Sequence, residues 1–168
     1  MKILAFLIPL LALVSCAGYQ LGGVKPASLA HVKTISVPMF TNGTLHPRAS
    51  ALATSAVANA VAQDGTYRIV RGEDADAVLE GNLREIRYSV LRGSRLDSLR
   101  PEELENRVTL QWTLRDGRDP TRILASGTSI GRSQLFVSAN LQTARNNALP
   151  EALERAAEAL VAAIANGY

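Results

Sequence analysis

A regularly alternating stretch in the second half of the chain constrains the fold more than any other feature. In residues 107–115 every second side chain is apolar: Val108, Leu110, Trp112 and Leu114. Such alternation predicts a β-strand, because successive side chains of a strand point to opposite faces of the sheet. The residues between them are Arg, Thr and Gln, so one face of this sheet is apolar and the other polar. The apolar face therefore needs other elements to cover it.

Four further segments have the composition of strands. Residues 31–37 are rich in β-branched side chains and stop at a proline, residues 66–70 form a short run, and residues 78–91 and 123–130 flank the alternating stretch. The apolar parity changes between Leu83 and Ile86, which predicts a β-bulge there. Residues 92–106 are predicted to be a functional or mobile loop, since hairpin loops usually have about two to five residues.

Two segments have helical periodicity. The first has Pro47 at its first position and ends at Gln63, before a Gly65 cap, with Leu45 and Ala49 opening its apolar stripe. The second begins at Ser138 or Asn140 and ends at Gly167, and Pro150 is expected to kink or restart it.

The first helix carries no charged residue between Ala49 and Gln63. A helix on a soluble domain usually has a charged outer face, so this helix is a candidate for cover on both sides, with Thr54 and Asn59 facing a partner. The alternative is that its Ser, Thr, Asn and Gln side chains are polar enough to face water.

These elements predict an α+β fold. The economical packing places two helices on one face of a mixed, mostly antiparallel four-stranded sheet. Residues 31–168 then form a single α/β sandwich domain, a common size for one hydrophobic core.

The chain begins with the pattern of a lipoprotein export signal. Residues 1–15 combine a lysine, an apolar run too short to span a bilayer, and small residues before Cys16. We expect cleavage before Cys16, acylation of its thiol, and a glycine-containing lipidated tether over residues 16–30. Ala17 favours the outer membrane, since lipoproteins similar to this one that stay in the inner membrane usually carry Asp there. An ordinary secretory signal with an incidental cysteine is the alternative.

The rest of the composition limits the kinds of partner and site that we expect. The formal net charge is +3, so nothing in the total requires nucleic acid, and the 15 arginines fit either anion binding or a GC-rich genome. Cys16 is the single cysteine, so no disulfide, thiol nucleophile or cysteine metal site is expected in the mature domain. We expect no cofactor other than the covalent lipid.

One short motif resembles that of an enzyme. Residues 127–131 read Gly-Thr-Ser-Ile-Gly, the pattern of a hydrolase nucleophile. Such enzymes place a histidine after the serine, whereas His31 and His46 both precede it, and residues 132–137 look extended rather than helical. We therefore predict no enzymatic activity and no metal site.

Several segments resemble the lipopolysaccharide-assembly lipoprotein family, LptE. They are residues 16–21 (Cys-Ala-Gly-Tyr-Gln-Leu), 32–44 (from Val-Lys-Thr-Ile-Ser-Val-Pro), 64–70 (Asp-Gly-Thr-Tyr-Arg-Ile-Val) and 76–81 (Asp-Ala-Val-Leu-Glu-Gly). The resemblance implies a two-helix, four-strand sandwich that plugs an outer-membrane β-barrel translocon, helps it to fold, and binds lipopolysaccharide while facing the periplasm.

In that family, basic residues on the loops of the sheet are thought to contact lipid phosphates. The positional candidates here are Arg92 and Arg95, followed by Arg118 and Arg122. Residues 34–44 are also similar to the opening strand of envelope modules, such as curli-secretion lipoproteins and the amino-terminal domain of the Tol translocation protein. That second resemblance implies a ring or an adaptor instead of a plug.

Overall fold

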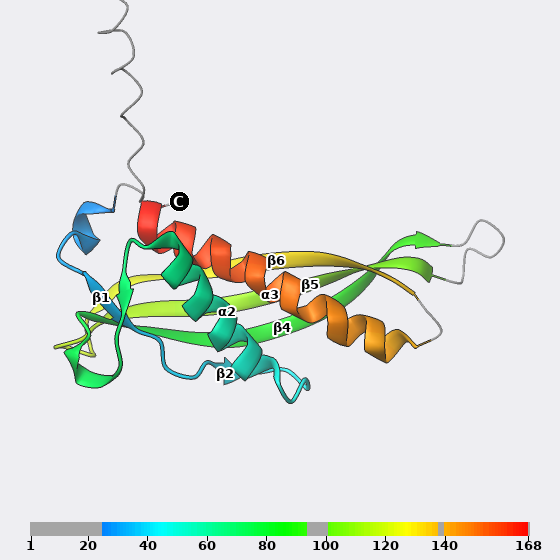
Figure 1. Ribbon diagram of the computed structural model, residues 1–168, viewed down its shortest axis with the longest axis horizontal. Coiled ribbons are helices and arrows are strands. Elements are labelled where there is room, and N and C mark those ends of the chain that lie inside the picture. The colour runs from blue at the N-terminus through cyan, green and yellow to red at the C-terminus, as the bar shows by residue number, and fades with distance from the viewer. Residues whose placement is uncertain (1–24, 94–100, 138–139, 168) are drawn as a thin grey trace, which may run out of the picture.

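The computed structural model describes residues 25–93, 101–137 and 140–167, which form one mixed sheet with two long helices on one face (Figure 1). The sheet has six strands: β1 (Thr34–Ser36), β2 (Thr41–Asn42), β3 (Arg68–Ile69), β4 (Ala77–Gly93), β5 (Pro101–Asp116) and β6 (Ile123–Phe136). Their order is β3-β1-β4-β5-β6, and β2 pairs with β4 beside this path. Strands β4, β5 and β6 form an antiparallel meander, while β1, β2 and β3 pair in parallel.

The α+β class and the two helices are confirmed, but the prediction of a mostly antiparallel, four-stranded sheet was wrong. The sheet is mixed and has six strands. The difference lies in β1, β2 and β3, which have only two or three residues each. Periodicity cannot separate such short strands from loops, and it carries no information on their direction of pairing.

The predicted long loop at residues 92–106 was also wrong. Strand β4 continues to Gly93 and β5 begins at Pro101, and these two residues are register partners. Bulges between Val90 and Gly93 break the alternation on β4. The predicted bulge is confirmed, since the β4–β5 register shifts between Leu83 and Glu85.

The helices begin and end close to the predicted positions. Helix α2 (Ala49–Asp64) starts two residues after Pro47, so Leu45 lies outside it and is fully exposed, and Gly65 ends it in the left-handed conformation. Helix α3 (Leu141–Asn166) is capped by Asn140, whose side chain accepts a hydrogen bond from the Thr143 N–H. Pro150 was predicted to kink or restart the helix; the helix is continuous through it, so it does not restart there. Two short 3-10 helices, η2 (Ala27–Leu29) and η3 (Gly72–Asp74), complete the structure.

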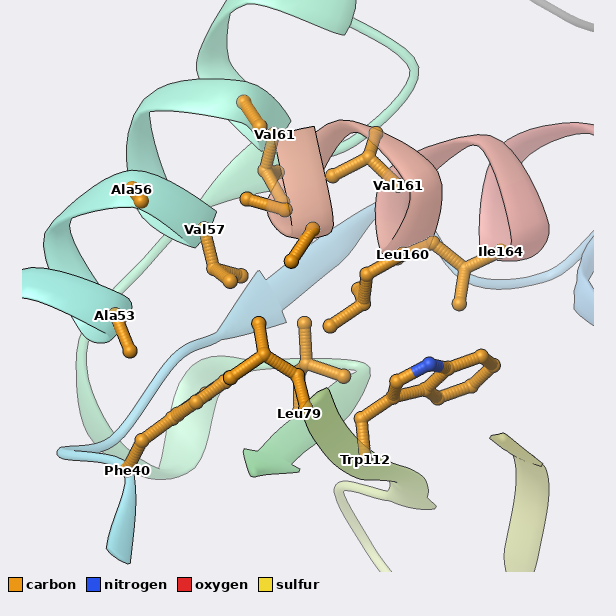
Figure 2. Close-up of a cluster of buried hydrophobic side chains, with 14 of the residues drawn as sticks. Phe40, Ala53, Ala56, Val57, Val61, Leu79, Trp112, Leu160, Val161 and Ile164 are labelled. Carbon is orange, nitrogen blue, oxygen red and sulfur yellow. The ribbon is translucent and has the colours of Figure 1, made fainter. Parts of the chain in front are cut away.

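The main core lies between α2, α3 and the apolar face of the sheet, which we call the inner face (Figure 2). The inward positions of β5 are confirmed, because Val108, Leu110, Trp112 and Leu114 are all buried. The Trp112 indole N–H donates to the Ser129 hydroxyl over 3.0 Å. The core therefore uses the tryptophan for both packing and a satisfied polar contact.

Glycines on the strands beside Trp112 make room for two aromatic rings. Gly81 and Gly127 are the register partners of Trp112 on β4 and β6. A methyl group at Gly127 would clash with the Trp112 ring, and one at Gly81 would clash with Phe40. At Gly131 a methyl group would clash with the backbone carbonyl of Ala152, so α3 packs directly on the backbone of β6.

A second, smaller hydrophobic cluster lies farther along the sheet. This distal cluster consists of buried Leu104, Leu135 and Ala148, with half-buried neighbours Tyr88, Val137, Leu141 and Ala144. Buried polar side chains stand beside it: the Ser133 hydroxyl donates to the Ala148 carbonyl over 2.7 Å, and the Asn106 amide does so over 3.5 Å. We call these two buried residues, which bond the same carbonyl of α3, the polar layer.

The chain enters the domain beside the end of α3 (Figure 1). Leu29 is buried in the main core, and the Lys25 ammonium donates to the Val32 carbonyl over 2.9 Å. The described chain is therefore already packed against the domain at Lys25 and Leu29. The buried Tyr67 hydroxyl donates to the Ile164 carbonyl over 2.7 Å, and burial raises the pKa of Tyr67 to about 12.

Candidate functional site

The predicted arginine site is divided between the two ends of the sheet. Arg92 lies on β4 near its hairpin end and is 3.8 Å from the Glu103 carboxylate. Arg118 and Arg122 lie in the turn between β5 and β6, at the other end of the antiparallel meander. Strand β5 separates these ends by about 50 Å, at roughly 3.3 Å per residue, so these side chains cannot form one site. Arg95 and Cys16 lie outside the described residues.

The turn between β5 and β6 is organised around Asp116. The backbone N–H groups of Arg118 and Asp119 donate to its carboxylate, and the Arg122 guanidinium is 3.8 Å away. These contacts, led by the Arg118 N–H, hold the pKa of Asp116 below its ordinary value. Asp116 therefore partly neutralises Arg122, while the Arg118 side chain remains exposed.

The two partner-facing residues predicted on α2 have different surroundings. Asn59 is exposed, as expected for an outer face. Thr54 is half-buried, and its hydroxyl accepts a hydrogen bond from the Phe40 N–H over 2.9 Å and donates to the Ser50 carbonyl over 2.8 Å. Thr54 thus holds the segment that carries Phe40 into the core.

The serine of the hydrolase-like motif has a structural role. Ser129 is 5% exposed, lies within β6, and accepts the Trp112 indole hydrogen bond. A nucleophile of that class stands on a sharp turn between a strand and a helix, whereas this serine sits in the middle of a strand. The three-dimensional structure therefore agrees with the reading of the motif as accidental.

A surface groove of about 930 Å³ lies where the beginnings of α2 and α3 approach β4. Apolar side chains of Leu45, Leu52 and Ile86 line it together with Pro47 and Pro150. Its polar lining includes His46, Arg48, Arg84, Tyr88 and Arg145. We refer to this hollow as the helix groove. Its volume falls in the range of small-molecule sites, about 300–1,000 Å³.

Arg145 and Tyr88 contact each other in the lining of the helix groove. The Arg145 guanidinium lies 4.8 Å from the centre of the Tyr88 ring, a cation–π geometry. Burial raises the pKa of the Tyr88 hydroxyl above its ordinary value, although the nearby Arg145 charge opposes that shift. Both the Tyr88 hydroxyl and the Arg145 Nε are buried and have no hydrogen-bond partner among the described residues.

A hydrogen-bonded loop positions His46 at the edge of the same groove. The Asn42 side-chain amide donates to the His46 carbonyl over 2.8 Å, and the Thr44 N–H and hydroxyl donate to the Asn42 side-chain oxygen. His46 Nε2 lies 3.3 Å from the side-chain oxygen of Asn146 on α3. Its other ring nitrogen, Nδ1, is buried with no partner in the part of the chain that the structure describes.

The charge of the helix groove is positive and largely uncompensated. Within the described residues, Arg48, Arg84 and Arg145 form no ion pair, and the Glu85 carboxylate is held by Arg87 at 2.8 Å. Arg84 instead contacts the neutral amide oxygen of Gln111 at 3.2 Å. The first turn of α2 borders the groove and has neither an acidic residue nor a side-chain cap. The site is therefore suited to an anion.

Sequence reasoning did not identify His46, Tyr88 or Arg145 as a site. They lie on the loop before α2, on β4 and on α3, so no local motif contains them. One signal was present: Arg145 stands next to Ala144 in the apolar stripe of α3, where a charged residue is costly unless it has a role.

Neither described helix combines the length and the apolar character needed to cross a membrane. Among the described residues, no three His, Cys, Asp or Glu side chains are grouped as a metal site.

Comparison with known proteins gives one family and several structures. The family model LptE, described as lipopolysaccharide-assembly, matches residues 32–164. No curated protein sequence matches the chain. A minor lipoprotein from Acinetobacter baumannii is similar in structure, with 16% identity, a TM-score of 0.55, and coverage of 79% of this chain and 92% of that one. A protein from Xanthomonas campestris has 15% identity and a TM-score of 0.54, with coverage of 77% and 81%. At these identities the two structures support the fold alone.

Proposed function

The chain belongs to the lipopolysaccharide-assembly family LptE, and we propose that it is an outer-membrane lipoprotein that plugs a lipopolysaccharide-export β-barrel. In this proposal the domain also helps the barrel to assemble and binds lipopolysaccharide. Acylated Cys16 anchors it, with residues 1–15 removed as the signal and the domain facing the periplasm. The activity is binding and assembly, with no chemical step and no cofactor.

The observation that carries this proposal is the exposed face of α2. Its exposed side chains are Ala51, Ser55, Asn59, Ala62 and Gln63, all small or uncharged. The exposed face of α3, by contrast, carries Glu151, Glu154, Arg155 and Glu158. A plug is surrounded by the side chains of a barrel lumen, where small uncharged residues permit close approach and buried charges would be costly.

The plug is tested by placing a charge on that face. Asn59→Arg should greatly reduce recovery of the barrel with the protein from detergent-solubilised outer membranes, while the isolated domain stays folded. Thr54→Arg is a poorer test, because Thr54 also holds the Phe40 segment. Glu158→Arg, on the charged face of α3, is the matched control and should leave recovery normal. Normal recovery with Asn59→Arg would exclude this helix as the buried face.

A second experiment tests the anchor. Cys16→Ala should release the protein from the membrane fraction in cells that lack the barrel partner, because the remaining chain has no acyl group to hold it. Two or more acyl chains hold a protein stably, at roughly 0.8 kcal/mol for each buried methylene. Unchanged membrane association in those cells would contradict the acylation of Cys16. If wild-type protein brings down no barrel and forms a homo-oligomer, the ring or adaptor alternative replaces the plug.

Lipopolysaccharide binding by the loop arginines is tested separately at the two ends of the sheet. Arg92→Glu with Arg95→Glu should weaken binding if the hairpin end contacts the lipid phosphates, since charge reversal replaces attraction by repulsion. Arg118→Glu with Arg122→Glu tests the opposite end. Equal binding by the wild type and both double variants at low salt would remove all four residues from the lipid site.

A further inference from the structure

We propose that the helix groove binds the phosphate group of an amphiphile, at a site separate from the loop arginines. This inference rests on the proposed function, since it places one part of an anionic lipid on the domain. It arises from His46, Tyr88 and Arg145, which bring unpaired polar atoms to one positively charged and partly apolar hollow.

The unpaired atoms are the first step of the argument. A buried polar atom without a hydrogen bond costs about 1–3 kcal/mol, so folded proteins rarely leave one unpaired. Of the five such side-chain atoms among the described residues, three belong to residues that line the helix groove: His46 Nδ1, Tyr88 Oη and Arg145 Nε. Their concentration in one hollow is expected if a ligand oxygen completes their hydrogen bonds.

The second step is the charge of the ligand. Arg48 and Arg145 line the groove with no carboxylate partner within the described ranges, and Arg87 already neutralises Glu85. The Arg84 guanidinium contacts Gln111 instead. Guanidinium groups suit phosphate because their planar N–H donors match its oxygens. With the two guanidinium groups of Arg48 and Arg145 available, a doubly charged phosphate is better matched than a single carboxylate.

The third step is the apolar part of the lining. Leu52 and Ile86 are half-buried beside the cations, and Leu45 stands fully exposed at the rim. A free inorganic anion bound at the arginines would leave the neighbouring leucine side chain exposed to water. An alkyl group attached to the phosphate would cover it.

The groove is also held in shape before any ligand arrives. Asn42 bonds fix the loop that carries His46, and the Gly43 N–H donates to the Leu83 carbonyl over 2.9 Å. The Arg145 guanidinium is already stacked on Tyr88. A site ordered in advance loses less conformational freedom on binding, which favours affinity.

The test uses the full-length protein in neutral detergent micelles and dodecyl phosphate as the probe, measured by equilibrium dialysis. Dodecyl maltoside, which lacks the phosphate, and inorganic phosphate, which lacks the alkyl chain, form the other two arms. We expect binding of dodecyl phosphate that is at least about tenfold tighter than that of either control ligand. Equal binding of dodecyl maltoside would overturn the requirement for a phosphate group. Equal binding of inorganic phosphate would overturn the requirement for an alkyl chain.

Two variants assign the binding to this groove. Arg145→Gln should weaken dodecyl phosphate binding about tenfold, and Arg155→Gln, on the exposed side of the same helix, should leave it within twofold. Tyr88→Phe removes only a hydroxyl that has no partner among the described residues, so it should weaken binding severalfold without lowering the melting temperature. Unchanged affinity in both Arg145→Gln and Tyr88→Phe would overturn the site.

A final readout separates this inference from the proposed function. Arg145→Gln should still recover the barrel from outer membranes, because Arg145 is not on the exposed face of α2. Loss of phosphate binding with normal barrel recovery supports the groove as an independent site. Normal dodecyl phosphate binding by wild-type protein that recovers no barrel would contradict the plug and leave the groove intact.

Discussion

The two ends of the sheet differ in how they are stabilised. At the near end, where the chain enters, both helices cover the sheet, and the main core includes Phe40, Trp112 and Leu160. At the hairpin end, where β4 ends and β5 begins, the distal cluster has only Leu104, Leu135 and Ala148 buried, under the first half of α3. The polar layer of Asn106 and Ser133 stands beside the distal cluster. Stability is thus concentrated at one end, while the helix groove lies between the two.

This contrast indicates that the hairpin end can open locally while the near end stays folded. Regions with few buried apolar contacts open at a lower free energy than the whole domain. A partner or ligand that contacts the hairpin end would therefore add order to the less stable part of the molecule. The predictions below test that difference.

The largest effect is expected in the main core. Trp112→Ala should lower the free energy of unfolding by about 3–5 kcal/mol, since it removes a large buried ring and leaves the Ser129 hydroxyl without its indole donor. Chemical denaturation of the purified protein measures it. A nearly unchanged midpoint would mean that the main core does not carry the stability, and the comparison would fail.

A smaller and more local effect is expected in the distal cluster. Leu135→Ala should cost about 2 kcal/mol, at the low end for leucine, because the half-buried neighbours can close around the cavity. Amide hydrogen exchange should become faster in residues 101–106 and 141–148 and remain slow at Leu110 and Leu160. Equal acceleration throughout the domain would show that the two ends unfold as one unit.

A stabilising change should make the two ends more alike. Asn106 is fully buried, and its side-chain oxygen has no partner in the described part of the chain. Asn106→Leu replaces this partly satisfied amide by an apolar side chain of similar size and should raise stability by about 1 kcal/mol. Slower exchange in residues 101–106 is the expected result. A loss of stability would show that the polar layer is required for packing of α3.

The smallest effect concerns pH at the near end. The Asp76 carboxylate accepts hydrogen bonds from the N–H groups of Lys33 and Thr34, which hold its pKa below the ordinary value. Its contribution is therefore complete above the unfolded pKa, about 4, and is lost as pH falls through the lower folded value.

Denaturation midpoints between pH 3 and pH 7 measure this contribution. Asp76→Asn should destabilise the protein at pH 7 and flatten its loss of stability below about pH 4. An equal acid slope in the wild type and the variant would exclude Asp76 as a source of the pH dependence.

The sequence was most informative where a pattern was long. The alternation around Trp112 predicted a strand and its buried face, and the periodicity of both helices placed them within a few residues. The hairpin end was missed because Asn106 occupies an inward position that an apolar residue would have marked, and because bulges shift the parity near Arg92. Strands of two or three residues leave too little pattern to detect.

The candidate site could not be predicted from the sequence, because it is formed by contacts between segments that no local pattern contains. Arg92, Arg118 and Arg122 were grouped because all were expected on loops of the sheet, but the antiparallel register places them at opposite ends. The helix groove joins residues from α3, β4 and the loop before α2, whose meeting depends on how the helices pack. A lone arginine beside an apolar stripe was the one local sign.

The length of β4 also determines the distance between the two ends of the domain. Its 17 residues span about 55 Å at roughly 3.3 Å each, more than the roughly 40–45 Å of a bilayer with its headgroups. The described chain enters at the near end (Figure 1). The distance from that end to the hairpin end is determined by a paired strand, whose length is fixed. Removing two residues from β4 and two from β5 in register would shorten that reach by about 7 Å and keep each side chain on its face. Such a variant would change the distance between the two ends of the sheet while each remaining side chain keeps its face.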